Sequence, residues 1–453
     1  MTDNHDTTAT GDRAAKVQSA IDGWNDQLAS DDRREKYDKM KSSAFIFYRG
    51  TNHLFWEDFA GDKRLSRFGD EFTRTWLQGD LHAENFGAFG NDEGEVVYDI
   101  NDYDEAVIAD YQYDLWRMAV SIVLVARQDE NAKLSDKDQA AVIDAFASSY
   151  LDQLRFYVKK DGSEDTMVFD ASNTGSPLVE FLKDPKKRSS RAKMLDDWTQ
   201  LAGGGRRFNL AGSKGKLADV SDSRRSEILQ GMRDYEATLV KQPKNHRSGY
   251  FEVKDVARRL AAGTGSLGVQ RFYVLIAGAD DSPQSNRILD IKQQLGPTAY
   301  HFLSSQDRAE YEWLLKKYLG RDARWHEAAY RAMAKYTDDH LGWMKLSDGF
   351  YSVRERSIFQ EAFPTKGLGR AEFVGLAEQW GKILATDHSR ALTAFNSEYP
   401  EGSDRQFMPR VPRFKQEVGA KTANRHNEFR ALVRKVAFDY AKQVEADWDA
   451  FRK

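Results

Sequence analysis

Ten consecutive residues, QGDLHAENFG from Gln78 to Gly87, hold an aspartate, a histidine, a glutamate and an asparagine between glycines. Asp80, His82 and Glu84 alternate along this stretch, so a β-strand would present all three on one face, where they could bind a metal ion. The same polar residues also fit a turn that has only a structural role. The alternation alone leaves both interpretations open.

A two-metal hydrolase is a second form of the metal interpretation. The Gly-Asp-x-His pattern that ends at His82 also occurs in metallophosphoesterases, which hydrolyse their substrates with metal ions and without ATP. That fold needs Asn-His pairs followed by an acid further along the chain. The pairs Asn52-His53 and Asn245-His246 are not followed by an acid. The sequence therefore disfavours this class.

A different spacing connects Asp80 with Asn85, which follows after four intervening residues. Downstream, the stretch EVVYDI at residues 95–100 is typical of a strand, and it leads into a polar loop that contains Asp102. Mg²⁺ binds hard oxygen ligands, takes few of them from the protein and completes its shell with water and phosphates. Asn85 and Asp102 are therefore the predicted Mg²⁺ ligands. Asp80 is the predicted catalytic residue, which would orient and deprotonate an acceptor hydroxyl.

These elements resemble the aminoglycoside phosphotransferases and related small-molecule kinases. GDLHAENFG resembles their catalytic loop, NDYDEA resembles their metal-binding loop, and YDL resembles the element whose aspartate, here Asp114, braces the catalytic loop. Gln78 stands where those enzymes carry a histidine, but a glutamine can still hydrogen-bond the loop backbone. The resemblance implies an ATP- and Mg²⁺-dependent phosphotransferase that acts on a hydroxyl group of a small molecule. AMP transfer on the same fold and a nucleotide-binding scaffold without catalysis are the alternatives.

The segment GTGSLGV, residues 263–269, has the glycine spacing of a nucleotide-binding loop. It lies between two strand-like stretches, as the kinase glycine loop does, whereas the dinucleotide-binding fingerprint lies between a strand and a helix. A plain glycine hairpin fits the same residues. In the phosphotransferase interpretation, the residues that cover the nucleotide phosphates are Gly263, Gly265, Ser266 and Gly268.

Lys292 ends the alternating stretch RILDIK, and its place after the glycine segment matches the kinase lysine that holds the α- and β-phosphates of ATP. Taken alone, it also fits a surface lysine. A glutamate on the next helix should pair with this lysine. Glu327 in RWHEAAYRAMAKY is the predicted partner, and Glu310 and Glu312 compete with it. Gln293 follows the lysine, where an acidic residue is expected.

These motifs follow one another along the chain in a different order from that of the phosphotransferases that they resemble. The catalytic and metal loops come first, the glycine segment and lysine follow, and residues 375–392 resemble the helix that directly precedes the catalytic loop in phosphotransferases. A circular permutation gives this order, and it is tolerated where chain ends lie close together at the surface. The expected fold is therefore α+β, a two-lobed protein-kinase-like fold in circularly permuted order. The expected parts are an N-terminal disordered or helical extension (1–42), large-lobe catalytic and metal loops with helices (43–200), a small lobe with the glycine loop and lysine (201–360), and large-lobe C-terminal helices (361–453).

Hydrophobic periodicity predicts the elements that position these motifs. Residues 1–13 have little to bury and are expected to lack structure. Strands are expected at 75–78, 95–100, on both sides of the glycine segment, 287–292 and 349–357, and residues 42–50 are expected to form a short apolar strand or a buried turn. Helices are expected at 14–42, 110–128, 129–157, 307–336 and from 372 to the end of the sequence, and residues 203–216 are expected to form an exposed loop or hairpin.

The chain as a whole resembles DUF2252, a bacterial family of unknown function. The matching stretches extend from about Phe45 to His388 and are FYRG, GDLHAENFG, DINDYDEA, DLWRMAVS, DVARRLAAGTGSLG, LDIKQQ, HLGW and SVRE. The family has no assigned reaction, so this resemblance favours an architecture rather than a substrate.

The amino-acid composition limits the classes of partner that the chain is expected to bind. The 453 residues include 67 basic and 71 acidic side chains, a net charge of −4, which gives no electrostatic reason to expect nucleic acid. The absence of cysteine excludes disulfides and thiolate metal sites. The N-terminus lacks an apolar secretion segment, and no apolar run approaches the roughly 20 residues of a membrane helix. We expect a cytoplasmic protein without a membrane partner, whose ligands are a nucleotide with Mg²⁺ and a small-molecule acceptor.

Overall fold

The computed structural model describes residues 5–90, 96–128, 134–184, 190–260, 263, 267–316, 322–335, 337–397 and 414–453. The fold is α+β, as the sequence predicts. Its helices are α1 (His5–Trp24), α2 (Ser30–Lys41), α3 (Ala44–Gly50), α4 (Asn52–Phe59), α5 (Gln112–Gln128), α6 (Asp136–Lys159), α7 (Leu178–Lys183), α8 (Arg191–Trp198), α9 (Asp222–Tyr235), α10 (Ser305–Leu314), α11 (Asp322–Met333), α12 (Arg370–Ser397), α13 (Phe414–Thr422) and α14 (His426–Phe451). Its strands are β1 (Arg74–Leu77), β2 (Phe86–Gly90), β3 (Val96–Ile100), β4 (Val107–Asp110), β5 (Thr199–Ala202), β6 (Gly205–Phe208), β7 (Leu217–Ala218), β8 (Val253–Arg259), β9 (Arg271–Ile276), β10 (Arg287–Gln294), β11 (Gly342–Leu346), β12 (Gly349–Glu355) and β13 (Gln360–Ala362).

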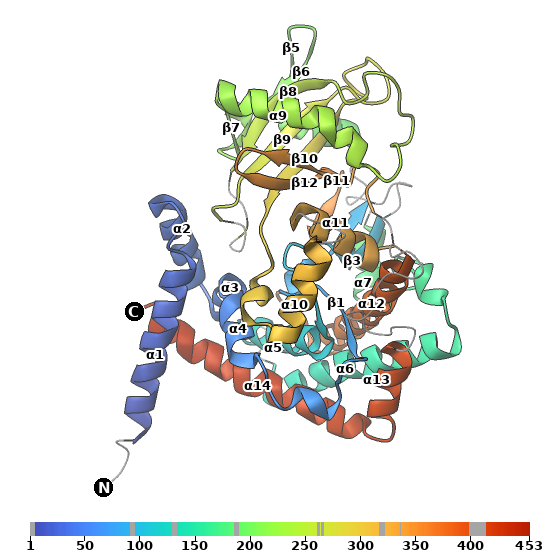
Figure 1. Cartoon of the computed structure of the whole chain (residues 1–453). Helices are drawn as coiled ribbons and strands as arrows, with labels where there is room; N and C mark the ends of the chain where they lie inside the picture. Colours follow the sequence, from blue (N-terminus) through green and yellow to red (C-terminus); the bar gives the residue numbers. More distant parts are fainter. Residues whose placement is uncertain are drawn as a thin grey trace.

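A six-stranded antiparallel sheet forms the upper lobe in Figure 1, in the order β11-β12-β10-β9-β8-β7. Side chains alternate between the two faces of each strand. Leu289 and Ile291 of β10 therefore point to one face, where they pack with Ile228 of α9. Asp290 and Lys292 point to the opposite face. Polar side chains of the sheet thus reach toward the lower lobe.

The predicted strands around the glycine segment are confirmed as β8 and β9, which pair directly, and RILDIK is confirmed within β10. The stretch at 349–357 is confirmed as β12, which pairs with β10. The exposed loop or hairpin expected at 203–216 is found in part: β5 and β6 form a hairpin, but its first strand precedes the predicted range.

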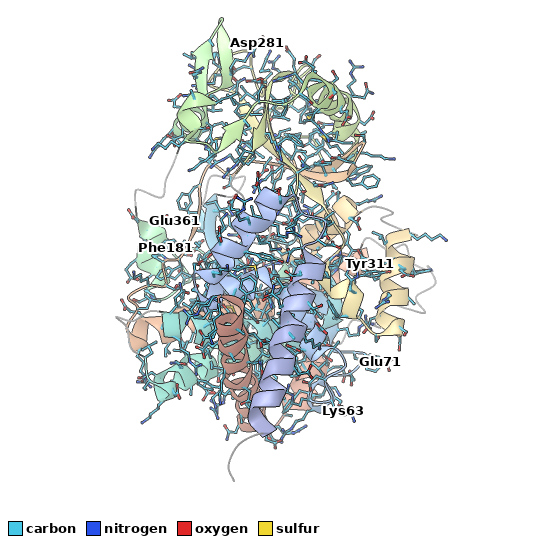
Figure 2. All side chains as sticks on the ribbon, turned by 90° about the vertical axis from the view of Figure 1, so that its left-hand side faces the viewer. Lys63, Glu71, Phe181, Asp281, Tyr311 and Glu361 are labelled. Atoms are coloured by element: carbon cyan, nitrogen blue, oxygen red, sulfur yellow. The ribbon has the colours of Figure 1, made fainter. Side chains whose placement is uncertain are left out.

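Helices α5, α6, α12 and α14 form the body of the lower lobe (Figure 1). Helix α5 is buried from Leu115 to Ala126 because it has apolar side chains around most of its circumference. In the side view of Figure 2, Asp281 lies at the far end of the upper lobe and Lys63 near the opposite end of the molecule. None of the described helices combines the length and the apolar character that crossing a membrane requires.

Small sheets of the lower lobe position the loops that carry the polar motifs. Strand β1 pairs with β4, and the order of the three-stranded sheet is β13-β2-β3. Strand β13 follows the upper-lobe sheet in sequence, but it pairs with β2, which begins directly after Asn85. This pairing fixes the end of the upper lobe against the loop that contains Asp80 and Asn85.

Two expectations are wrong. Residues 44–50 form helix α3, not a strand, and the Ser43 hydroxyl caps the helix by accepting a hydrogen bond from the Ile46 N–H at 3.2 Å. This stretch buries side chains on more than one face, so its apolar pattern could not separate helix from strand. Residues 5–13 are helical, because α1 begins at His5. Arg13 anchors this helix through ion pairs with Asp58 at 2.6 Å and Asp447 at 2.9 Å.

Candidate active site

A cleft of about 400 Å³ lies between the two lobes. Its lining includes five of the residues that the sequence singled out, from four separate stretches of the chain. They are Asp80 and Asn85 from the catalytic loop, Asp102 from the loop after β3, Gly263 from the glycine segment and Lys292 from β10.

Asp114 holds the catalytic loop. This loop leaves β1 and enters a short 3₁₀ helix, η2 (Ala83–Asn85). The Asp114 carboxylate, in the first turn of α5, accepts hydrogen bonds from the backbone N–H of Gln78 at 2.7 Å and of Gly79 at 3.1 Å. Gly79 has a φ of +83°, and a side chain there would collide with the Glu105 carbonyl oxygen. The loop is therefore fixed to α5 through its backbone.

Gln78 ties the two polar loops together. Its side-chain Nε2 donates a hydrogen bond to the Asp102 carbonyl oxygen at 3.0 Å, and its Oε1 accepts one from the Asp80 N–H at 2.8 Å. The Gln78 side chain thus bonds the backbone of both loops.

Asp80 faces the cleft and forms an ion pair with Arg117 of α5 through its Oδ1. The Arg117 side chain is only 1% exposed, and its guanidinium lies over the Tyr48 ring, 4.3 Å from the centroid. Burial raises the pKa of Asp80, and the charge of Arg117 opposes this shift. Arg117 therefore fixes the orientation of the carboxylate and favours its charged form.

Asn85 and Asp102 line the same part of the cleft. The Asn85 side-chain oxygen accepts a hydrogen bond from the His82 N–H at 2.9 Å, which fixes the amide plane. Burial raises the pKa of Asp102, and the neighbouring Asp104 carboxylate raises it further. Two acids packed together in a buried site favour a nearby cation, so this donor set suits a hard metal ion.

Lys292 reaches from the upper lobe to the lower one and forms an ion pair with Asp104. Gln294 Nε2 also donates a hydrogen bond to Asp104, at 3.0 Å, and His326 Nε2 lies 3.5 Å from the same carboxylate. Burial alone would raise the pKa of Asp104, but the charges of Lys292 and His326 hold it well below its ordinary value. Asp104 is therefore a charged partner that joins the loops to the sheet.

The model of the family DUF2252, described as an uncharacterized protein conserved in bacteria, matches residues 30–453. The chain belongs to this family. The match includes both polar loops, the glycine segment and Lys292. No curated protein and no solved structure matches the chain. The function of this DUF2252 protein must therefore be argued from the cleft itself.

The glycine segment of the DUF2252 chain is described only in part. Gly263 lines the cleft, whereas Gly265 and Ser266 lie outside the described residues, so their predicted role stays a prediction. Gly268 has a φ of +86°, and a side chain there would collide with Leu28. The connection between α1 and α2 therefore packs against the glycine segment.

Glu327 lies on α11, where its carboxylate forms an ion pair with Arg331 one turn later, at 2.9 Å. Arg331 also donates a hydrogen bond to the Leu341 carbonyl oxygen at 2.7 Å, which links α11 to the start of β11. The preceding residue, His326, lines the cleft. The predicted pairing of Glu327 with Lys292 stays a prediction.

The arrangement of Asp80, His82 and Glu84 differs from the strand that the first metal interpretation assumed. Asp80 and His82 lie in a loop and Glu84 in the 3₁₀ helix, so the three do not alternate along one strand face. Arg49 donates a hydrogen bond to His82 Nε2 at 3.2 Å and forms an ion pair with Glu84. Burial and the charge of Arg49 lower the pKa of His82. These side chains therefore brace the loop.

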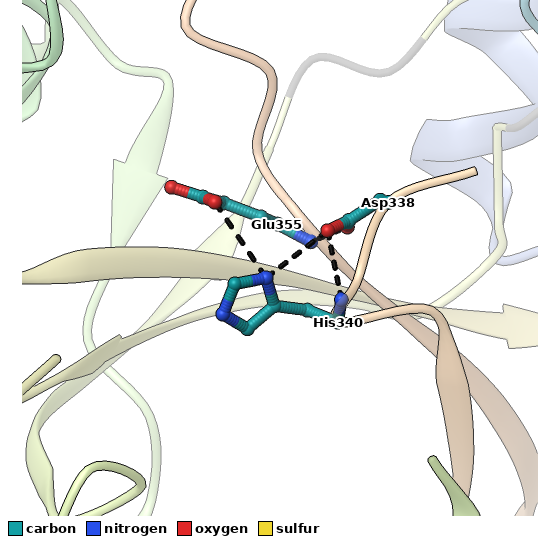
Figure 3. Close-up of side chains that lie close together, drawn as sticks. All are labelled: Asp338, His340 and Glu355. Atoms are coloured by element: carbon teal, nitrogen blue, oxygen red, sulfur yellow. Dashed lines mark hydrogen bonds and ion pairs between the residues drawn. The ribbon is translucent and has the colours of Figure 1, made fainter. Parts of the chain in front are cut away.

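Asp338, His340 and Glu355 form a group of three ionisable side chains that lie close enough together to share a cation (Figure 3). His340 Nδ1 lies 3.0 Å from Asp338 and 3.6 Å from Glu355. Burial lowers the pKa of His340, but bonding to Asp338 outweighs it, and the pKa is raised. A histidine that favours its proton is a poor metal ligand, because metal binding requires the neutral ring. These three side chains therefore form an internal ion-pair network.

The sequence interpretation missed Asp104 and Arg117 as parts of the site. Arg117 follows Asp114 by three residues on a predicted helix, so both point to the same side of α5. This spacing could have identified Arg117 from the sequence. Asp104 had no comparable signal, because its bond with Lys292 joins residues that are 188 positions apart.

Proposed function

We propose that this DUF2252 protein is an ATP- and Mg²⁺-dependent phosphotransferase that phosphorylates a hydroxyl group of a small molecule. One observation carries the proposal: the cleft gathers the side chains that phosphoryl transfer needs. They are Asp80, Asn85, Asp102 and Lys292.

The order of elements in the upper lobe supports the proposal. Strands β8 and β9 flank the glycine segment, β10 carries Lys292, α11 follows, and β11 and β12 complete the sheet. Protein kinases have a glycine loop between strands, a lysine on the next strand and then a helix. The catalytic and metal loops precede these elements here, as a circular permutation of the kinase order would have it.

Asn85 and Asp102 are the residues that would hold Mg²⁺. The raised pKa of Asp102 has its origin in burial beside Asp104, and a bound cation would relieve this unfavourable arrangement of charges. Mg²⁺, when bound, supplies positive charge that offsets the charge of the transferred phosphate.

Asp80 is positioned to take the proton of the acceptor. Arg117 binds its Oδ1, and Oδ2 would accept the hydroxyl proton as the acceptor oxygen forms a bond to the γ-phosphorus. The bond from that phosphorus to the β,γ-bridging oxygen breaks, and ADP leaves with the electron pair. Lys292 would contact the α- and β-phosphates. Asp80 has a raised pKa through burial, and this makes its carboxylate a better proton acceptor.

The test is product analysis with MgATP and a panel of hydroxyl-bearing small molecules. We expect ADP and a phosphorylated acceptor. Asp80→Asn should lower turnover by about 10²–10⁴-fold and largely spare ATP binding. Asp31→Asn, at a side chain that is 90% exposed, is the matched control. Release of pyrophosphate with AMP on the acceptor would replace phosphoryl transfer by AMP transfer, and full activity of Asp80→Asn would refute the assignment of Asp80.

A further inference from the structure

A second cavity, of about 540 Å³, adjoins the catalytic cleft where β12 ends. We name it the arginine cavity. The two spaces have lining residues in common, among them Asn101, Arg271 and Arg354. The volume lies in the range of small-molecule sites. One ligand can therefore occupy the arginine cavity and extend into the cleft.

The carboxylates that line the arginine cavity already have internal partners. Glu355 lies 2.7 Å from Arg191 and 3.4 Å from Arg287. Asp290 accepts a hydrogen bond from Arg271 Nε at 2.7 Å, and a second one from the other end of the same guanidinium. Three arginines thus surround these two carboxylates, so the pairs leave no uncompensated negative charge to repel an anionic ligand.

The other two acids of the lining are also engaged. Asp338 bonds the His340 ring and the backbone N–H of Glu355. Asp339 lies 2.5 Å from the Lys241 ammonium. These carboxylates are thus already bonded to neighbouring groups of the protein, as Figure 3 shows for Asp338 and Glu355.

Three further arginines of the cavity lining, Arg259, Arg354 and Arg356, have no carboxylate bonded to them among the described residues. Within the described part of the chain, the Arg354 guanidinium forms no hydrogen bond and no direct ion pair, although Asp290 and Asp102 lie near enough to interact with its charge, and it lines both the cavity and the cleft. Arg259 donates to the Tyr273 hydroxyl at 3.3 Å and to backbone carbonyl oxygens, and Arg356 donates to the Ser357 carbonyl oxygen at 3.1 Å. Among the described residues, neither has a carboxylate partner. These three guanidinium groups carry positive charge that the cavity wall does not neutralise.

Two of the three arginines lie over the same aromatic ring, and the third is close to one of them in sequence. Arg259 and Arg356 both lie over the Trp198 ring, with 5.4 Å and 4.7 Å from guanidinium carbon to ring centroid. Arg354 lies in β12, and Arg356 directly follows this strand, where its backbone N–H still bonds the Ile288 carbonyl oxygen at 2.7 Å. Side chains two residues apart on a strand leave the same face about 7 Å apart. Trp198 holds two of the guanidinium groups in place before a ligand arrives.

We propose that the arginine cavity binds a phosphate-bearing group, with its oxygens held by Arg259, Arg354 and Arg356. A guanidinium matches the paired oxygens of phosphate, and several together favour a ligand with more than one negative charge. The site rests on the residues of the cavity and not on the proposed phosphotransferase. The phosphate belongs either to a phosphorylated acceptor or to the nucleotide itself.

Calorimetric titration of the full chain with inorganic pyrophosphate tests this site. We expect pyrophosphate to bind the wild type and to bind Arg354→Gln about tenfold more weakly, because the substitution removes a charge-assisted bond but keeps a polar side chain. Arg259→Gln should weaken binding as well. Arg34→Gln, at a side chain that is 72% exposed on α2, removes the same charge elsewhere and should bind like the wild type.

Equal affinity of the wild type and both cavity variants, or no binding to the wild type at millimolar pyrophosphate, overturns the proposal. Thermal unfolding shows that each variant is folded, and Arg354→Lys, which keeps the charge, should recover part of the affinity. A titration with pyrophosphate in saturating MgATP then shows which ligand supplies the phosphate group that this site binds. Undiminished pyrophosphate binding assigns the site to a separate phosphorylated acceptor, and competition assigns it to phosphates of the nucleotide.

Asp102→Asn separates this site from the proposed function. Asp102 lines the cleft and is not part of the arginine-cavity lining. This variant should therefore lose Mg²⁺-dependent ATP binding and keep pyrophosphate binding. Loss of both would contradict the assignment of pyrophosphate to the arginine cavity.

Discussion

Lys292 of the upper-lobe sheet forms an ion pair with Asp104 of the loop that follows β3. The pair joins the two lobes across the cleft that also contains Asp80, Asn85 and Asp102. In the proposed reaction Lys292 contacts phosphates, so Asp104 holds the ammonium in place before the nucleotide binds.

Breaking this pair should destabilise the fold. Lys292→Met leaves the Asp104 carboxylate partly buried without its main cation, and we expect a loss of about 2 kcal/mol in the free energy of unfolding. The loss is below that for a fully buried pair because the side chains are 15% and 24% exposed. Urea unfolding of both single variants and of Lys292→Met with Asp104→Asn measures the coupling. Strictly additive losses would show that the two residues do not interact.

Removing Arg117 should change the pH dependence of catalysis. Arg117 favours the charged form of Asp80, so Arg117→Met should raise the pKa of Asp80. A general base must be deprotonated, and the acidic limb of the pH profile of kcat/KM should therefore move to higher pH. Arg117→Lys keeps the charge and should move it less. An unchanged acidic limb in Arg117→Met would show that Arg117 supports the fold without acting on Asp80.

His53 should make the fold sensitive to acid. Its side chain is 2% exposed, its ring nitrogens make no hydrogen bond among the described residues, and burial lowers its pKa to about 3. The unfolded chain takes up this proton near pH 6.5 and the folded chain does not, so the stability contribution is present above about pH 6.5 and declines as the pH falls toward 3. At pH 5 the loss is about 2 kcal/mol.

His53→Phe keeps the ring that stacks on Trp24 at 4.9 Å and removes the proton site. The wild type should therefore lose about 2 kcal/mol more than this variant between pH 7.5 and pH 5, as chemical unfolding at each pH would measure. His301→Phe is the matched control, because the His301 side chain is exposed in the folded chain. Identical pH dependence in the wild type and His53→Phe would contradict the assignment.

Local patterns predicted much of the fold. The strand before Lys292 and the strands around the glycine segment follow from alternation and from glycine, which are properties of adjacent residues. The pattern of residues 44–50 failed because their side chains are buried on several faces. Of the three arginines in the arginine cavity, Arg354 alone stood out in the sequence, as a possible phosphate anchor or a structural ion pair, whereas the cavity could not be predicted because only the folded sheet brings Arg259 and Arg354 to the same lining. For the same reason the pairing of Lys292 with Asp104, 188 positions away, was not expected from the sequence.

Calorimetric titration with ATP, in the presence and absence of Mg²⁺, tests the central claim most directly. The wild type should bind ATP with Mg²⁺ and much more weakly without it. Asp102→Asn should weaken the Mg²⁺-dependent binding about tenfold or more, because it removes a charged ligand of the metal, while Asp31→Asn should bind as the wild type does. The absence of ATP binding to the wild type, with or without Mg²⁺, would contradict the account.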